Sequence, residues 1–402
     1  MPGVLPEGEP VPVDGALPPS ALTADNSAGF GVYVHVPFCA SRCGYCDFNT
    51  YAPGEGVVRD GYVEAVLSEL ALADRVLGGG RTVDTVFVGG GTPTLLDAGE
   101  LGRILKAIDS TWGLAADAEV TTEANPESVD PASLRALRAA GYNRISLGMQ
   151  SAAPHVLRVL DRRHTPGRAA AAAVEARAAG FDHVNLDLIY GTPGESADDF
   201  ASSLRAVVDA GVDHVSAYAL IVEDGTRMAA RMRRGELPYP DDDVAADRYL
   251  AAEAALTAAG FGWYEVSNWA RDEAARCRHN LLYWAGGDWW GLGPGAHSHV
   301  GGVRWWNVKH PAAYAGRLAA GESPAQARER LTPAERRTEH VMLRLRLSSG
   351  LPLSTLDDAG RAAARRAVGD GLLAVEPFAA GRAVLTLRGR LLADAVVRDL
   401  LP

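Results

Sequence analysis

The sequence predicts an α/β fold: a partial (β/α)6 TIM-like barrel followed by a small C-terminal winged-helix-like domain. Six short apolar, β-branched segments alternate with longer segments of helical character rich in Ala, Leu and Arg, which is typical of a parallel sheet. The chain has 402 residues, of which 47% are hydrophobic and 22% charged. A chain of this size and composition can bury a large core and divide into one large and one smaller domain.

The predicted barrel elements follow one another at regular intervals. The expected strands are Phe30–Val36, Asp84–Val88, Glu119–Glu123, Arg144–Gly148, His183–Ile189 and His214–Leu220. Helices are expected at Gly61–Leu77, Glu100–Ser110, Pro131–Ala140 and Ala169–Ala179. In such a barrel, the functional residues gather where the strands end.

The remaining chain divides by composition. Residues 1–28 are rich in Pro, Ala, Gly and Ser and are predicted to form a flexible tail, and the barrel is expected over 29–260. Residues 261–330 form an aromatic-rich segment with poor periodicity, which favours a loop region that carries a site. Residues 331–402 make up the winged-helix-like domain, whose first helix opens on the capping box Thr332-Pro333-Ala334-Glu335.

Charge and cysteine usage exclude several classes of function. The net charge of -11 disfavours general adhesion to nucleic acid or to anionic lipid, and we expect no nucleic-acid partner. No apolar run approaches the roughly 20 residues needed to span a bilayer, and no signal peptide is recognisable. Four cysteines, three of them clustered, suggest a metal site in a reduced compartment, so we expect a cytoplasmic protein.

Cys39, Cys43 and Cys46 form the pattern C-x3-C-x2-C directly after the first predicted strand. Three thiolates on one tight loop can bind three irons of a [4Fe-4S] cluster and leave the fourth iron open to another ligand. A structural zinc site is the alternative, but zinc commonly takes four protein ligands, and the remaining thiol is Cys277, more than two hundred residues away. The spacing therefore favours the cluster.

Polar residues and glycines recur at the later strand ends. The run Gly89-Gly90-Gly91-Thr92 follows the second predicted strand, and glycines there are as often a tight turn as a ligand cradle. Several polar side chains at successive strand ends of one barrel are less readily explained as surface residues. They are Glu123, Gln150, Arg162 and Asp187.

The cysteine motif, its place after the first strand and these downstream elements resemble the radical S-adenosylmethionine (SAM) superfamily. Within it, the chain is most similar to the family of the oxygen-independent coproporphyrinogen III oxidases. The resemblance implies a [4Fe-4S] cluster whose open iron is chelated by SAM. It also implies SAM contacts from Tyr33, Tyr45, Gly90, Gly91, Thr92, Glu123, Gln150, Arg162 and Asp187.

Two features separate the chain from the oxidases it resembles. Their cysteine motif continues with a further cysteine, whereas this chain has Phe48 at that point. The string His279-Asn280-Leu281-Leu282-Tyr283-Trp284 resembles the haem chaperone branch of the family, and a histidine amid aromatics can ligate haem iron. His279 is therefore a candidate haem ligand, although such a histidine is more often a packing residue. Cys277, His297 and His299 are further candidates.

The resemblance implies a haem chaperone that binds haem as cargo and transfers it to an acceptor haem protein. The expected acceptor is a respiratory protein, which can be membrane-bound, and a homodimer is compatible with the sequence. The alternative function is oxygen-independent coproporphyrinogen III dehydrogenation. Whether the chain cleaves SAM, and so whether it is an enzyme, is left open by its residues.

Overall fold

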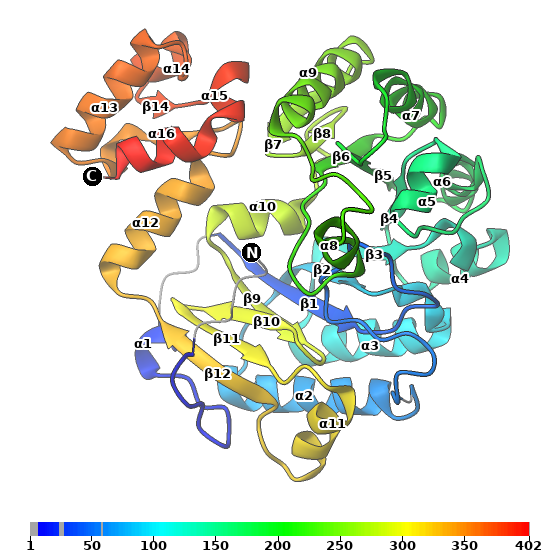
Figure 1. The fold of residues 1–402 in the computed structure, drawn as a ribbon. Coiled ribbons are helices and arrows are strands. Elements are labelled where there is room, and N and C mark those ends of the chain that lie inside the picture. Colours follow the sequence, from blue (N-terminus) through cyan, green and yellow to red (C-terminus); the bar gives the residue numbers. More distant parts are fainter. Residues whose placement is uncertain (1–6, 24–27, 58, 402) are drawn as a thin grey trace.

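The computed structural model describes residues 7–23, 28–57 and 59–401. Its centre is a run of six parallel strands that are adjacent in chain order, from β1 to β6 (Figure 1). They are β1 (Phe30–Val36), β2 (Val83–Gly90), β3 (Leu114–Ala124), β4 (Arg144–Gln150), β5 (His183–Tyr190) and β6 (His214–Ala219). β1 and β6 do not pair with each other, so the barrel is open, and the predicted α/β class with a partial (β/α)6 arrangement is confirmed.

The helices that connect these strands start where the sequence supplies caps. Asp97, Asp130 and Ser196 close capping boxes at the first turns of α3, α4 and α7. The helices of the barrel are α2 (Tyr62–Leu77), α3 (Ala98–Trp112), α4 (Pro131–Ala139), α5 (Pro154–Val159), α6 (Arg168–Ala178), α7 (Ala197–Asp209), α8 (Arg227–Arg233) and α9 (Asp242–Ala258). Short 3-10 turns follow β2 and β3, namely η1 (Pro93–Leu95) and η2 (Pro126–Ser128).

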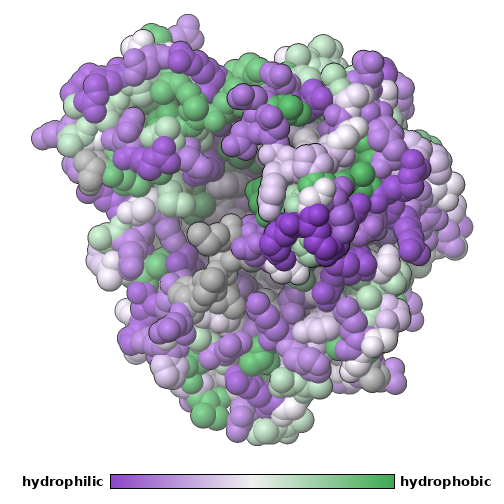
Figure 2. All heavy atoms as spheres, viewed as in Figure 1, coloured by the Kyte–Doolittle hydropathy of each residue, from purple (hydrophilic) through white to green (hydrophobic). Residues whose placement is uncertain are grey.

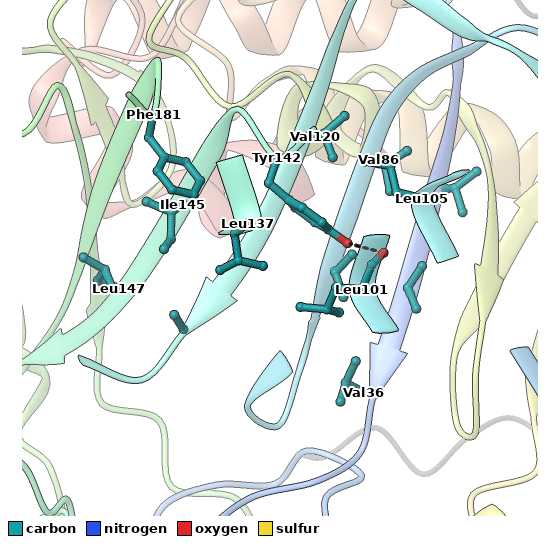
Figure 3. Close-up of a cluster of buried hydrophobic side chains, with 14 of the residues drawn as sticks. Val36, Val86, Leu101, Leu105, Val120, Leu137, Tyr142, Ile145, Leu147 and Phe181 are labelled. Carbon is teal, nitrogen blue, oxygen red and sulfur yellow. Dashed lines mark hydrogen bonds between the residues drawn. The ribbon is translucent and has the colours of Figure 1, made fainter. Parts of the chain in front are cut away.

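The main core lies between the sheet and the helices packed on its outer face. Figure 3 shows Val86 and Val120 of neighbouring strands together with Leu101 and Leu105 of α3. Tyr142 is fully buried there, and its hydroxyl donates to the Leu101 carbonyl at 3.2 Å. Strands buried on both faces explain why the predicted strands were continuous apolar runs.

The segment expected to be loops over 261–330 forms strands instead, and this corrects the prediction. β9 pairs in parallel with β1, while β10 to β12 continue the sheet in antiparallel order, and β8 and β7 extend the opposite edge beyond β6. The added elements are β7 (Gly262–Glu265), β8 (Asn268–Ala270), α10 (Arg278–Ala285), β9 (Asp288–Leu292), β10 (His297–Val300), β11 (Val303–Asn307), α11 (Pro311–Ala319) and β12 (Ala325–Arg330). The strands are three to six residues long, too short for a clear period.

Residues 7–23 differ from the flexible tail expected over 1–28. Glu9 exchanges two backbone hydrogen bonds with Arg328 of β12, and its carboxylate pairs with Arg328 and Arg330. The short helix α1 (Pro19–Leu22) buries Ala21 against Gly301. This segment therefore covers the edge of the sheet; the rest of the predicted tail lies outside the described residues, apart from residue 28.

The C-terminal unit has its own core. The capping box at Thr332 opens α12 as predicted, and the unit's apolar cluster includes Val341, Leu345 and Val396. Its elements are α12 (Pro333–Arg344), β13 (Leu351–Pro352), η3 (Leu353–Thr355), α13 (Asp358–Gly369), α14 (Val375–Ala379), β14 (Arg382–Ala383), α15 (Leu387–Leu391) and α16 (Ala393–Leu400), with β13 and β14 antiparallel. The helices and the two-stranded sheet of this unit are the kinds of elements that we expected in the winged-helix-like domain.

The surface in Figure 2 is mostly hydrophilic, and its hydrophobic residues gather in small groups over the C-terminal helices and near α9. Among the described residues, no helix is both long and apolar enough to cross a bilayer.

Candidate cofactor site

A cavity of about 490 Å³ opens at the carboxyl ends of the central strands. This volume is in the range of small-molecule and cofactor sites. Eleven of the thirteen predicted site residues line it: Cys39, Cys43, Tyr45, Cys46, Gly90, Gly91, Thr92, Glu123, Gln150, Arg162 and Asp187. Tyr33 and His279 lie elsewhere.

The cysteine loop that follows β1 is held by backbone hydrogen bonds on several sides. The Cys39 N–H donates to the Tyr51 carbonyl at 3.0 Å, and the Gly44 N–H donates to the Leu160 carbonyl at 3.0 Å. Met228, in α8, donates its N–H to the Gly44 carbonyl at 2.9 Å. The loop is thus fixed between the end of β1, the end of α5 and the start of α8.

The three cysteines are free thiols, each partly exposed to the cavity. Burial raises the pKa of the Cys39 thiol and raises that of Cys46 to about 11. An Arg162 guanidinium nitrogen lies 3.5 Å from the Cys43 sulfur. No three Cys, His, Asp or Glu side chains in the described ranges come together as a site for one metal ion.

The glycines after β2 permit a close approach of backbone to the cysteine loop. A Cβ on Gly91 would lie 2.4 Å from the Phe38 carbonyl oxygen and 3.0 Å from the Cys39 sulfur. Gly90 has a φ of +112°, which side-chain-bearing residues rarely adopt. The Gly90 N–H donates to a Glu123 carboxylate oxygen at 3.0 Å, so the glycine turn and the end of β3 form one wall.

Two buried carboxylic acids face the cavity, from β3 and β5. Burial and the nearby Asp187 charge raise the pKa of Glu123 to about 7. Burial also raises the pKa of Asp187, which accepts hydrogen bonds from the Ser146 hydroxyl at 3.0 Å and the Asn185 amide at 2.6 Å. Near neutral pH, Glu123 can therefore exchange a proton, and either carboxylate can accept from an ammonium or hydroxyl group.

Arg162 brings a positive charge between the carboxylates and the cysteine loop. It donates to the Gly148 carbonyl at 2.8 Å, while its buried Nε has no hydrogen-bond partner among the residues that the structure describes. A guanidinium with a free donor suits a ligand carboxylate. Gln150 ends β4 with a φ of +66°, which ends the regular strand at the cavity wall.

The thiols, the glycine wall, the carboxylates and the free guanidinium donor together fit the proposed cluster and SAM. Three thiols on one loop can each take one iron, and the amino acid part of SAM would find both a carboxylate and a guanidinium. Tyr45, between two of the cysteines, adds an aromatic ring to the same wall.

Tyr33 does not line the cavity and contacts residues that lie next to it. Its hydroxyl is 3.0 Å from His35 Nδ1, and its ring stacks on Phe87 at 6.3 Å. His35 Nε2 lies 2.9 Å from the carbonyl of Asn49, in the segment that follows the cysteine loop. Tyr33 is therefore placed to orient His35 and not to contact a ligand in this cavity.

His279, the predicted haem ligand, is enclosed in this structure, and haem ligation by it would require the site to open. The side chain is 1% exposed, and both ring nitrogens have hydroxyl partners at 2.8 Å, the Thr85 hydroxyl at Nδ1 and the Tyr283 hydroxyl at Nε2. The ring stacks on Phe87 at 5.2 Å, and burial lowers the pKa of His279 to about 3. His279 thus has the environment of a hydrogen-bonded core histidine, which was the alternative interpretation of its sequence context.

The whole string around His279 fastens α10 to the barrel. The backbone N–H groups of Arg278 and His279 donate to the Glu119 carboxylate of β3 at 2.9 and 3.0 Å. The Cys277 thiol, fully enclosed beside the same carboxylate, donates to it at 3.5 Å. His297 is exposed at the start of β10 and stacks on Trp306, while the half-buried His299 has a ring nitrogen 3.0 Å from the Gly287 carbonyl.

Several cavity residues were not anticipated from the sequence. Ser146 lies two and four residues before Gly148 and Gln150, so strand alternation places all three on one face and was the signal for it. Several others are large apolar residues that sit where apolar residues are ordinary: Phe48, Ile189, Tyr218, Leu220 and Ile221. Charged residues that were not predicted also line the cavity, namely Asp47, Asp161, Arg163 and Glu223.

Comparison with known proteins agrees with the cysteine loop and the fold. A sequence model of the radical SAM superfamily matches residues 33–207. The haem chaperone HemW of Mycobacterium tuberculosis is 59% identical over 374 residues, which cover 92% of this chain and 95% of the relative. HemW of Escherichia coli is 39% identical over 67% of this chain and 70% of its own length.

The coproporphyrinogen III oxidase HemN of Escherichia coli, a radical SAM enzyme, has a similar solved structure. It matches with a TM-score of 0.80 at 25% identity, covering 95% of this chain and 92% of HemN. The likeness includes the barrel, the added strands and the C-terminal unit, because nearly the whole chain is covered.

Proposed function

The chain belongs to the HemW haem chaperones of the radical SAM superfamily, and on that premise we propose that it binds haem and transfers it to acceptor haem proteins. The observation that carries the proposal is the cavity in which the cysteine loop meets the polar strand ends. We propose a respiratory haem protein, which can be membrane-bound, as the acceptor. Free cysteines at the site suit a reducing compartment, and we place the protein in the cytoplasm.

Within this proposal, Cys39, Cys43 and Cys46 would hold a [4Fe-4S] cluster, which could supply an electron to SAM when bound. Arg162, which contacts the Cys43 sulfur, would offer its free donor to the SAM carboxylate. Glu123 and Asp187 would accept hydrogen bonds from the amino and hydroxyl groups of SAM, and the wall of Gly90 and Gly91 would leave room for the ligand.

Coproporphyrinogen III dehydrogenation is the second candidate, favoured by the fold shared with HemN. Phe48 counts against it, because the oxidases resemble this chain up to that position and then carry a further cysteine. Both functions need the cluster, so cluster binding alone does not separate them.

The decisive experiment offers both substrates to the anaerobically reconstituted protein. One sample receives haem, and its Soret absorbance is followed before and after an apo haem protein is added. The other receives coproporphyrinogen III, SAM and a reductant. We expect haem to bind and pass to the acceptor, with no protoporphyrinogen formed; protoporphyrinogen formation, or failure to bind haem, would contradict the proposal.

The cluster assignment has its own test, with iron and sulfide content as the readout. Replacing Cys39, Cys43 and Cys46 together by alanine should abolish the reconstituted iron and sulfide. Cys277→Ala is the matched control, because Cys277 is buried beside Glu119 and outside the cavity. Loss of iron in the control with retention in the triple variant would reverse the assignment.

A further inference from the structure

Three apolar side chains remain exposed to solvent along the open side of the cofactor cavity. Phe48, Tyr218 and Ile221, which we call the apolar rim, line the cavity with exposed fractions of 59%, 42% and 68%. They come from the segment after the cysteines and from the end of β6 and the residues that follow. The proposed cluster and SAM contacts use none of them. Exposed apolar side chains that gather at one opening mark a site for an apolar ligand.

A cation without a partner lies at the same cavity. Arg163 is exposed and lines the cavity, and it makes no hydrogen bond or ion pair with any residue within 7–23, 28–57 or 59–401. Its neighbour Arg162 is turned inward to Gly148 and Cys43. Since Asp47 and Glu223 also line the cavity and would repel an anion, a ligand carboxylate is drawn to the Arg163 side.

The segment of α10 that contains His279 offers haem no comparable exposed apolar surface. His279 is enclosed by Phe87, Thr85 and Tyr283, and both of its ring nitrogens are engaged. Opening that site would leave the Thr85 and Tyr283 hydroxyls buried without partners. Haem recognition through His279 would therefore require the base of the barrel to unpack.

We propose that haem docks across the mouth of the cofactor cavity, with Phe48 and Ile221 against the porphyrin face and a propionate at Arg163. This inference rests on the proposed haem-binding function and adds its location. A flat apolar ring with carboxylates on one edge matches an apolar rim with one free guanidinium. Phe48 gains a role here, since it provides ring surface where the oxidases have a thiol.

Haem in this position covers the opening through which SAM enters and leaves. Bound haem should therefore slow the release of SAM without displacing it. The effect needs the apolar rim, because the rim holds the ring over the opening. It does not need the deeper contacts of Glu123, Asp187 or Arg162.

The test compares haem dissociation constants, from Soret titration of the cluster-loaded full chain, among surface variants. The double variant Phe48→Ser/Ile221→Ser should weaken haem binding by roughly tenfold or more, and Arg163→Glu by several-fold. Phe48→Trp should retain the affinity, because it keeps an aromatic face. The controls are Val375→Ser, 67% exposed in α14, and the exposed Arg135→Glu in α4; each should change the affinity by less than about twofold.

Release of labelled SAM provides the second readout. Haem should slow the release from the wild-type chain and not from the double variant, while SAM affinity without haem stays within about twofold in both. The docking site would be overturned if the double variant bound haem as tightly as the wild-type chain. It would also be overturned if the double variant lost SAM binding and kept haem binding. If the wild-type chain itself fails to bind haem, the proposed haem-binding function is contradicted. That outcome is distinguishable from a failure of the docking site alone.

Discussion

Glu69 of α2 is a fully buried carboxylate that joins three parts of the molecule. It accepts from the Gly293 N–H at 2.8 Å, the Asn307 amide at 2.7 Å and the Tyr314 hydroxyl at 2.5 Å. Despite these donors, burial raises its pKa from the ordinary 4.5 to about 7. The charged form is therefore the less stable one in the folded protein.

This raised pKa predicts a pH dependence with a definite sign. Below pH 4.5 both states hold the proton, and between about 4.5 and 7 only the folded state does, so the free energy of unfolding falls as pH rises through that window. Glu69→Gln is neutral throughout. The stability of the wild type relative to this variant should drop by up to about 3 kcal/mol between about pH 5 and about pH 8, measured by urea unfolding. An unchanged difference would contradict the assignment.

His279 makes a prediction that separates packing from ligation. His279→Leu leaves the Thr85 and Tyr283 hydroxyls without their partner, so we expect a loss of about 2–4 kcal/mol in the free energy of unfolding. Tyr283→Phe removes one of the two hydrogen bonds and should cost about 1 kcal/mol. Haem affinity, measured on the folded fraction, should not change. Weaker haem binding at unchanged stability would restore His279 as the ligand.

Most cavity residues could be predicted because they combine a distinctive chemistry with a strand end. Cys39, Glu123 and Asp187 stand out for this reason. Phe48 and Ile221 could not be distinguished from core residues, because the sequence does not show whether an apolar side chain is buried or exposed in the fold. The position of His279 depends on where α10 docks, which is set by contacts with strands about 160 and 194 residues away in sequence.

At the scale of elements, long periodic segments were predicted well and short edge strands were not. β1 has the predicted bounds, and the other five central strands overlap their predictions. By contrast, β9 is five residues long and exists because it pairs with β1, more than 250 residues earlier. Local sequence carries little of that information, since pairing at a sheet edge is decided by tertiary contacts.

The N-terminal segment behaves as an edge cover in the structure, and this can be tested. A chain that begins at residue 24 loses the backbone bonds from Glu9 to Arg328 and the contact of Ala21 with Gly301. The uncovered edge of β12 should lower the thermal midpoint and promote self-association, since unpaired strand edges recruit other strands. Light scattering during a thermal scan measures both effects.

The single substitution Glu9→Ala is the control for that truncation. It removes the ion pairs with Arg328 and Arg330 and keeps the backbone bonds. Because these ion pairs are partly exposed, the midpoint should hardly move. A truncated chain that scatters no more light than this variant would show that the segment does not protect the edge.

At the scale of the whole molecule, a polar chain runs through the barrel from the cavity to α10. Asn185 donates to Asp187 at 2.6 Å, and its carbonyl oxygen lies 2.7 Å from His214 Nδ1. His214 Nε2 is 2.7 Å from the Tyr264 hydroxyl, which accepts from the Cys277 N–H at 3.2 Å. The cofactor cavity and α10 are thus parts of one packed interior, and the C-terminal unit is attached outside it.

That attachment includes one partly buried ion pair, Arg390 of α15 with Glu253 of α9. The guanidinium donates to both carboxylate oxygens, at 2.9 and 2.7 Å, and lies over the Trp263 ring at 4.4 Å; the side chains are 7% and 18% exposed. Arg390→Ala leaves Glu253 with the Trp269 N–H as its hydrogen-bond donor. Removing one member of a fully buried pair typically costs about 3–5 kcal/mol. Because this pair is only partly buried, we expect a smaller cost and a local loosening of the interface.

Hydrogen exchange can locate this loosening and separate it from the cofactor site. Arg390→Ala should increase exchange in α9 and α15 and leave the cysteine loop and haem affinity unchanged, because the cavity is built from strand ends and not from the C-terminal unit. Arg388→Ala is the matched control on the same helix, since Arg388 donates to the Asp370 carbonyl within the C-terminal unit. If both variants exchange alike, the ion pair does not hold the units together. If haem affinity falls with Arg390→Ala alone, the C-terminal unit takes part in binding haem, and the mouth of the cavity is not the whole site.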